Sequence, residues 1–446
     1  MAGEISPKMQ GSNGNHVEKI MSLPFNKFPV VSPFCTQSLV IGDGVSLTNQ
    51  TSCIIIGSQY PTGPAPSVSS GSSNSIIIGS GSGSYNPPSA SSNCVMIGAV
   101  SAGSAAGSGS TIIGVGNNSG SSNQVIIGSG NTCQSGNAIV LGTGNTISGS
   151  NSYPIVIGSG MGNYSGYSYP MAIGQSATFG ANYACAVGYS ASAGGSSAIA
   201  LGNGATANGT NSIAIGLSTT VSGSNAIGMG FGIVGGGSYF VGLGGNSYPN
   251  GNYTITVGYF SQATASNAIA IGGGTSATNA AVASGIQSIA LGTTSKAALQ
   301  GQFAYGNDAL IGTSSRTSYV RVANQTTSNA TTALWLDSTT ATVDIVLQLN
   351  SMNYFCCIIV GKITGASDAA TYKIEGAVQV GATKSTTALV GSPVTTGIGQ
   401  TLGASSWGGV SVSTNSTAGS IRFSVSGAAS TTIDWFGKCD LVELAY

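Results

Sequence analysis

The side chains best suited to contacting a ligand are aromatic, and they gather in two parts of the 446-residue chain. All three tryptophans lie in the C-terminal part, and tyrosines are densest in "NYSGYSYP" at positions 163–170. Aromatic faces stack on sugars, and rigid aromatic loops make good contact surfaces. Trp is also a common core residue of a β-sandwich, and such tyrosines also cover turns or join chains. The candidate contact residues are Trp335, Trp407, Trp435, Tyr164, Tyr167 and Tyr169.

Catalytic groups are scarce and far apart in this sequence. The long segment between Asp43 and Lys296 contains no Asp, Glu, Lys, Arg or His. A glycoside hydrolase needs a pair of carboxylates, and Asp43 and Asp308 stand at opposite ends of this segment. A Ser-His-Asp site would depend on His16, the only histidine of the chain. We therefore expect no enzymatic activity and no cofactor.

Ordinary charges return in the C-terminal part. We interpret them as solvated faces and small ion pairs, with a carbohydrate site as the alternative. Eleven basic and eleven acidic residues give the chain no net charge, so nothing indicates a nucleic acid or an anionic membrane as partner. The C-terminal charges include Asp337, Asp344, Asp368, Glu375, Asp434, Asp440, Glu443, Lys362, Lys373, Lys384, Arg422 and Lys438.

The eight cysteines form no C-x-x-C motif and have no histidine nearby, so we expect no metal site. We interpret them as small buried apolar residues in a reducing compartment. The N-terminal sequence does not resemble a signal peptide, and no apolar run of about 18 residues predicts a membrane-spanning helix.

A short repeat dominates the middle of the chain. Aliphatic-x-aliphatic-Gly motifs recur there, and the commonest spacing between their closing glycines is about 14 residues. The remaining spacings are longer, which suggests insertions at one side of the unit only. The closing glycines are Gly42, Gly57, Gly79, Gly98, Gly114, Gly128, Gly142, Gly158, Gly174, Gly188, Gly202, Gly216, Gly230, Gly244, Gly258, Gly272, Gly292 and Gly306.

Such a unit is too short for a helix pair but fits two short strands and two turns, which is one coil of a parallel β-solenoid. In "SIAIG", Ile213 and Ile215 should project to one face and Ala214 to the other. The closing glycine allows positive φ at the corner. Each coil offers few aliphatic side chains, so we expect a second face to be buried against other chains. Three chains around an axis are the simplest closed arrangement.

The residue two before the closing glycine changes size along the repeat. It is Val, Ile or Met in the first eight units, and Ala, Gly or Thr in the last ten. The step lies between Gly158 and Gly174. It predicts a change of cross-section or of interface along the shaft, with drift among duplicated repeats as the alternative.

These motifs resemble the head repeats of trimeric autotransporter adhesins, most closely in "SSAIALGNGATANGTNSIAIG" and "QATASNAIAIGGG". The resemblance covers roughly residues 36–312. It implies a left-handed parallel β-roll of 14-residue coils with three chains to a rod. The sequence departs from that family because it shows neither a secretion signal nor a C-terminal membrane barrel.

The C-terminal part instead predicts strands and turns, in segments such as "TVDIVLQLN", "YFCCIIVGKI" and "SIRFSVSG". In the segments "YKIEGAVQVG", "TALVGSP", "SSWGGVSVS", "SIRFSVSG" and "TIDWF" it resembles a C-terminal β-sandwich module at the ends of many bacteriophage fibre and structural proteins. The sequence therefore predicts an all-β chain in three parts: an N-terminal attachment segment (1–35), a β-roll shaft (36–316) and an antiparallel β-sandwich tip (317–446). In the first part, the proline-rich "MSLPFNKFPVVSPF" should be extended.

Together these features favour a homotrimeric phage fibre. It would be made in the host cytoplasm, held in the tail or a capsid vertex through Phe25, Phe28 and Phe34, and apply its tip to a host-surface glycan or protein. A disordered leader with one apolar anchor is the alternative for the N-terminus. A bacterial cell-surface adhesin is the main alternative for the whole chain. An ice- or crystal-binding solenoid fits less well, because such surfaces need a flat threonine ladder.

Overall fold

The structure of the protein is a computed structural model. It describes residues 30–31, 38–41, 46–47, 51–57, 67–68, 73–79, 89–90, 92–100, 105–149, 151–162, 165–306, 315–336, 343–404 and 406–445. The proposed attachment residues Phe25, Phe28 and Phe34, and also Tyr164, lie outside these ranges. Within them the chain is nearly all β, which confirms the predicted fold class. Only three short 3₁₀ turns interrupt the strands there: η1 (Ala277–Asn279), η3 (Lys384–Thr386) and η4 (Leu402–Ala404).

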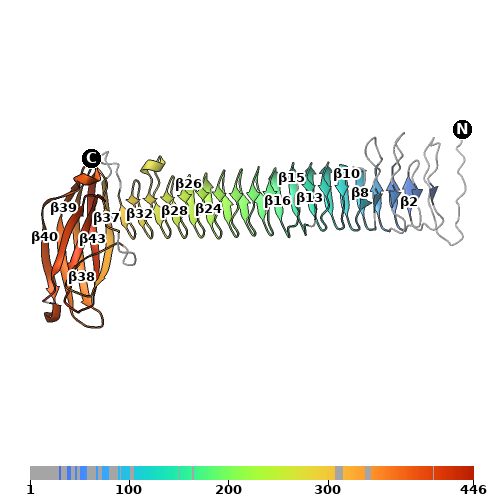
Figure 1. The fold of residues 1–446 in the computed structure, drawn as a ribbon. Helices are drawn as coiled ribbons and strands as arrows, with labels where there is room; N and C mark the ends of the chain where they lie inside the picture. The colour runs from blue at the N-terminus through green and yellow to red at the C-terminus, as the bar shows by residue number, and fades with distance from the viewer. Residues whose placement is uncertain are drawn as a thin grey trace, which may run out of the picture. The chain divides into compact units, whose positions relative to one another are not determined.

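The chain divides into two compact units, residues 1–218 and 219–446. In the first unit, successive coils stack and pair through parallel strands (Figure 1). The first strands of the coils form one sheet, and the second strands fall in separate groups that are together called sheet 2. Sheet 1 contains the strands of the repeated motif: β2 (Leu39–Ile41), β4 (Ile54–Ile56), β6 (Ile76–Ile78), β8 (Val95–Val100), β10 (Thr111–Ser119), β11 (Val125–Ser129), β13 (Ile139–Thr143), β15 (Ile155–Ser159), β16 (Met171–Gln175), β18 (Cys185–Val187), β20 (Ile199–Leu201) and β22 (Ile213–Ile215). Sheet 2 contains the second strand of each coil, with the end of β10: β1 (Val30–Val31), β3 (Ser46–Leu47), β5 (Ser67–Val68), β7 (Ser89–Ala90), β9 (Ala105–Ala106), β12 (Thr132–Cys133), β14 (Thr146–Ile147), β17 (Thr178–Phe179), β19 (Ser192–Ala193) and β21 (Thr206–Ala207).

The second unit begins with coils of the same kind. Their sheet 1 strands are β24 (Ile227–Phe231), β26 (Val241–Gly245), β28 (Ile255–Val257), β30 (Ile269–Ile271), β32 (Ile289–Leu291) and β34 (Phe303–Tyr305). Their sheet 2 strands are β23 (Thr220–Val221), β25 (Val234–Gly235), β27 (Tyr248–Pro249), β29 (Gln262–Ala263), β31 (Val282–Ala283) and β33 (Lys296–Ala297). The 14-residue period is the register of the sheets in both units: Ile199 lies beside Ile213, and Val241 beside Ile255.

The closing glycines are fixed by two constraints at once. Gly128 and Gly142 have φ of 133° and 128°, in the region that favours glycine. A Cβ on Gly128 would also collide with the carbonyl oxygen of Gly142 in the next coil. The predicted positive φ at the corner is therefore present, and the close stacking of corners gives a second reason why no larger residue stands there.

The residue two before the closing glycine lines the inside of the coil. Its change from large to small therefore alters how the coil interior is filled. From Gly57 to Gly216 the fully buried residues at this position are Ile55, Ile77, Met96, Ile112, Ile126, Val140, Val156, Ala172, Ala186, Ala200 and Ala214.

Where the interior residues are large, a buried asparagine ladder joins the coils. Asn131 Nδ2 donates to Asn117 Oδ1 at 3.0 Å and to the Gly142 carbonyl at 2.7 Å, and Asn145 Nδ2 repeats the pattern towards Asn131. These amides are fully buried, so the hydrogen bonds remove the cost of burying them and fix the register of the coils. After the size change, Ala184, Ala186, Ala191 and Ala193 fill the interior instead.

Insertions enter both turns of the coil, so the expectation that they occur at one side only does not hold. Thr146 follows Gly142 by four positions, as Thr132 follows Gly128, and the two extra positions of that coil lie between β14 and β15. After Gly272, by contrast, the extra residues carrying η1 come before β31. Either turn can lengthen because the strands on its two sides keep their pairing.

The C-terminal part has two antiparallel sheets. Sheet 3 has the order β35 (Ser315–Thr326), β43 (Ile433–Ala445), β38 (Ser351–Ile363), β39 (Ala369–Val380) and β40 (Ala388–Gln400). In sheet 4, β42 (Ser420–Ser426) pairs with β41 (Gly409–Asn415), β36 (Thr331–Ala333) and β37 (Ile345–Val346). One apolar core, including Phe355, Ile359, Phe423 and Trp435, joins both sheets. The predicted boundary between residues 316 and 317 falls inside β35.

Candidate interaction surfaces

The outer face of sheet 1 is apolar along the coils. On β22, Ala214 is fully buried inside the coil, while Ile213 and Ile215 lie on the outer side and are partly exposed. On β20, Ile199 and Leu201 are 40% and 43% exposed. The predicted alternation is correct, and the large residues occupy the outer side. Further outer-face residues of this kind are Ile78, Ile97, Ile127, Ile139, Ile255, Ile271 and Leu291.

The outer face of sheet 2 differs in chemistry. In the first unit its outward positions with described side chains are hydroxyl residues and Asn118, and in the second unit they are mixed. No continuous apolar row forms in these described strands, so the two faces of one coil are distinguishable surfaces. A row of aliphatic side chains on one face alone marks an interaction surface. The sheet 2 positions are Thr132, Thr146, Thr178, Ser192, Thr206, Thr220, Val234, Tyr248, Gln262, Val282 and Lys296.

Tyrosines form stacked ladders at one corner of the coils. Tyr153 and Tyr169 stack with ring centroids 4.9 Å apart, and Tyr169 and Tyr183 at 5.5 Å. Tyr239 and Tyr253 make a second ladder at 4.9 Å. All five rings are about half exposed, so their edges and hydroxyl groups face solvent.

These ladders occupy strained backbone positions. Tyr153, Tyr169 and Tyr183 have φ of 54–57°, a conformation that costs a side chain such as Tyr about 1 kcal/mol or more. At the same corner most other coils carry Asn, which tolerates it, as at Asn137 and Asn211. A residue such as Asn would relieve this backbone strain. The presence of Tyr at these positions therefore indicates a role for the aromatic rings.

The sequence contained the signal for the ladders, although only Tyr169 was singled out. Each ladder tyrosine stands five positions before a closing glycine, so the alignment of the coils at these glycines predicts that the rings stack. Tyr167 lies elsewhere in its coil, half-buried against Phe179 in an edge-to-face contact at 6.2 Å. Tyr153, Tyr183, Tyr239 and Tyr253 are therefore added to the candidates.

The structure places two of the three tryptophans in the C-terminal core. Trp407 and Trp435 are only 7% and 2% exposed and pack edge to face at 5.4 Å. The indole N–H of Trp435 donates to Thr326 Oγ1 at 2.9 Å. No ring face of either residue is open to a ligand, so both are withdrawn as contact candidates. Trp335 is partly exposed and remains one.

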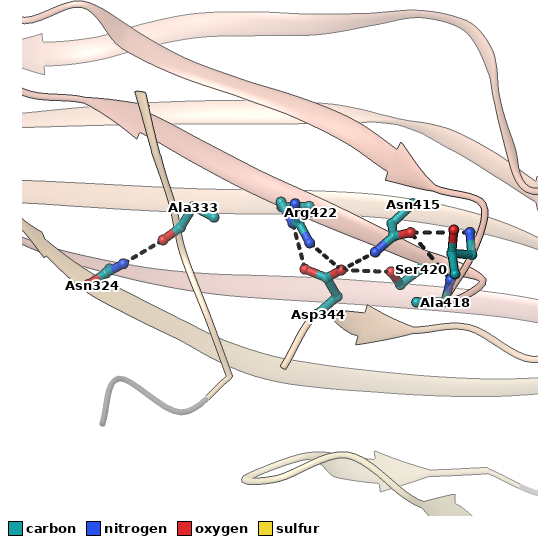
Figure 2. A network of polar contacts seen from close by, with 8 residues as sticks. Asn324, Ala333, Asp344, Asn415, Ala418, Ser420 and Arg422 are labelled. Carbon is teal, nitrogen blue, oxygen red and sulfur yellow. Dashed lines mark hydrogen bonds and ion pairs between the residues drawn. The ribbon is translucent and has the colours of Figure 1, made fainter. Parts of the chain in front are cut away.

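Trp335 stands beside an ion pair whose carboxylate is buried. The Arg422 guanidinium lies 4.9 Å from its ring centroid and donates to both carboxylate oxygens of Asp344, at 2.8 and 2.9 Å. Asn415 and Ser420 donate to the same carboxylate, so Asp344 receives four hydrogen bonds (Figure 2). The sequence predicted ion pairs here but gave no sign that Asp344 would be buried.

This network makes a prediction about acid stability. Burial alone would raise the pKa of Asp344, but the hydrogen bonds and the charge of Arg422 outweigh it, and the pKa is lowered. Asp344→Asn should therefore destabilise the C-terminal domain by about 2–3 kcal/mol at pH 7, which is less than for a fully buried pair because the Arg422 side chain is 35% exposed. A lowered folded-state pKa contributes stability above the unfolded value of about 3.9 and loses it as the pH falls further. The difference between the two proteins should shrink below about pH 4.

Denaturant titrations followed by tryptophan fluorescence will measure this difference, because all three tryptophans report on the C-terminal domain. Asp368→Asn is the control, since Asp368 directly precedes β39 and accepts an exposed hydrogen bond from Thr401. An equal pH dependence of the two variants would contradict the assigned role of Asp344.

Buried thiols and surface ion pairs account for several of the cysteines and lysines in the described part of the chain. Burial raises the pKa of the Cys133 thiol to about 11, as expected for an unreactive interior cysteine. Lys373 pairs with Glu375 and Lys438 with Asp440, both at 2.7 Å on the sheet 3 surface. Within the described ranges no group of three or more His, Cys, Asp or Glu could hold a metal, and no helix is long and apolar enough to cross a membrane.

No protein-family model matches the chain, and the comparison with curated proteins finds no similar sequence.

Proposed function

We propose that this chain is a non-enzymatic fibre protein of a bacteriophage virion. It forms a homotrimeric rod, attaches through its N-terminal segment to a tail or capsid-vertex protein, and carries its C-terminal domain towards a host-surface glycan or protein. The observation that carries the proposal is the apolar outer face of sheet 1. A chain without charges between Asp43 and Lys296 leaves this face as the main source of specific association.

Another copy of the same chain is the partner that fits this face best. The aliphatic residues repeat once per coil, so a partner must offer apolar groups at the same spacing over many coils. An identical chain has apolar groups at the same spacing because its sequence is the same. Closed rotational symmetry lets each copy bury its face against the others. The number three rests on the resemblance to trimeric autotransporter heads.

The phage assignment rests on the C-terminal resemblance, and the main alternative is a bacterial surface adhesin. Immunogold electron microscopy with an antibody against residues 317–446 distinguishes them. Label on fibres of virus particles is the expected result. Label on the envelope of uninfected producing cells would contradict the proposal and favour the adhesin. The mixed chemistry of the sheet 2 face does not favour an ice-binding surface.

The tyrosine ladders are the proposed contact surface of the shaft. Replacing Tyr153, Tyr169 and Tyr183 together by Asn should lower binding to an array of bacterial polysaccharides at least tenfold. Folding stability should stay equal or rise, because Asn adopts the corner conformation more readily. Tyr189→Asn is the control, since Tyr189 is 55% exposed but outside the ladders. If the triple variant binds the polysaccharides as strongly as the wild type, the tyrosine ladders are not a contact site.

A further inference from the structure

The last coil joins the C-terminal domain without a change of face. Strand β34 pairs with β35, which places Phe303 opposite Tyr319 and Ala304 opposite Ser318. Ala304 and Ser318 are buried, while the rings of Phe303 and Tyr319 stack on the outer side at 5.3 Å. The outer face of sheet 1 therefore continues directly onto the outer face of sheet 3.

Partly exposed apolar side chains continue on that face of sheet 3, around a group of charged side chains near its middle. Thr317 lies opposite Val442, and Val442 lies opposite Tyr354 on the next strand. On β38 the inward residues Phe355, Cys357 and Ile359 are fully buried, and Ile358 and Val360 lie on the outer side. This part of the strand is therefore apolar on both sides, as in sheets covered on both faces. The partly exposed apolar residues of this outer face are Met352, Tyr354, Ile358, Val360, Phe436, Val442 and Leu444, between 36% and 50% exposed.

Charges near the middle of this face are paired within one chain. Lys373 contacts Glu375, which also accepts a hydrogen bond from the Tyr354 hydroxyl at 2.9 Å, and Lys438 contacts Asp440. These two positive and two negative groups cancel, while the exposed Arg321, opposite Lys438 on β35, adds one positive charge to the face. The half-buried thiol of Cys356 lies among them, opposite Glu375 and Asp440.

We propose that the outer face of sheet 3 packs against the same domain in the other copies of the chain. This inference rests on the proposed homotrimer and adds that the C-terminal domain closes it. The outer face of sheet 1, which is proposed to pair the copies along the coils, runs through β35 into sheet 3 with no reversal. Sheet 4, with Trp335 and Arg422, is then the side left for contact with the host surface.

Two matched valines test the assignment in the full-length protein. Val360 lies on the outer face of sheet 3 and Val346 on the outer face of sheet 4, and both are 40% exposed. The native Cys356 supplies a local readout, because its face would be covered in the assembly. Iodoacetamide labelling of Cys356, followed by peptide mass spectrometry, measures how accessible this thiol is in the assembly.

Val360→Lys should speed the labelling of Cys356 at least tenfold, while Val346→Lys should label at the wild-type rate. Val442→Thr should give an intermediate labelling rate. Because this change is nearly isosteric and keeps the strand, it tests the inference even if the lysine variant does not fold. If Cys356 in wild-type trimers is labelled as fast as in Val360→Lys, the inference about sheet 3 is wrong, although the chain still forms trimers. A monomeric wild-type chain would instead overturn the proposed function.

Discussion

Replacing Leu201 by lysine is expected to weaken self-association of the chain by about 6 kcal/mol per trimer. Leu201 lies on the outer face of sheet 1 and is 43% exposed in one chain. In the proposed trimer each copy would bury an unpaired ammonium group, at a cost of about 2 kcal/mol or more each. The summed cost corresponds to about four powers of ten in the association constant.

Leu217→Lys is the matched control for this change. Leu217 is equally apolar and 46% exposed, but it follows the closing glycine Gly216 in a turn outside the apolar row. Sedimentation equilibrium over a concentration series should show dissociation for Leu201→Lys alone. Equal effects of the two lysines, or no effect of either, would exclude the sheet 1 face as the interface.

The second large effect is expected at a closing glycine. Gly128→Ala should destabilise its part of the shaft by about 3 kcal/mol or more, because the methyl group meets the Gly142 carbonyl and φ is 133°. Gly130→Ala should cost only about 1 kcal/mol. Its φ is also positive, at 64°, but no atom lies within 4 Å of the added carbon.

Hydrogen exchange of residues 105–149 measures both glycine variants. Faster exchange confined to Gly128→Ala is the expected result, since backbone hydrogen bonds between coils, such as Val125 N–H to the Ala138 carbonyl at 2.8 Å, depend on the stacking. Equal exchange in the two variants would mean that corner stacking does not limit stability.

The repeat made the shaft readable from sequence. A fixed 14-residue period determines which residues lie side by side, so Gly128 over Gly142 and Asn117 over Asn131 follow from counting. Alternation along "SIAIG" separated Ala214 from its isoleucine neighbours. Which of these faces points inward was harder to tell, because it depends on the curvature of the coil. The tyrosine ladders follow from the same alignment of coils, because each ring stands five positions before a closing glycine.

The C-terminal domain was less predictable because its contacts are distant in sequence. Trp407 and Trp435 are equally plausible as core or surface residues until the pairing of β38 with β43 is known. The burial of Asp344 depends on Arg422, which is far away along the chain. The continuity of sheet 1 into sheet 3 depends on the pairing of β34 with β35, which no local pattern predicts.

The molar mass of the full-length chain in solution tests the central claim most directly. Light scattering coupled to size-exclusion chromatography at neutral pH should give three times the single-chain mass of 43.6 kDa. A mass of 43.6 kDa, independent of concentration, would contradict the account, because the apolar outer face of sheet 1 would then have no identical partner.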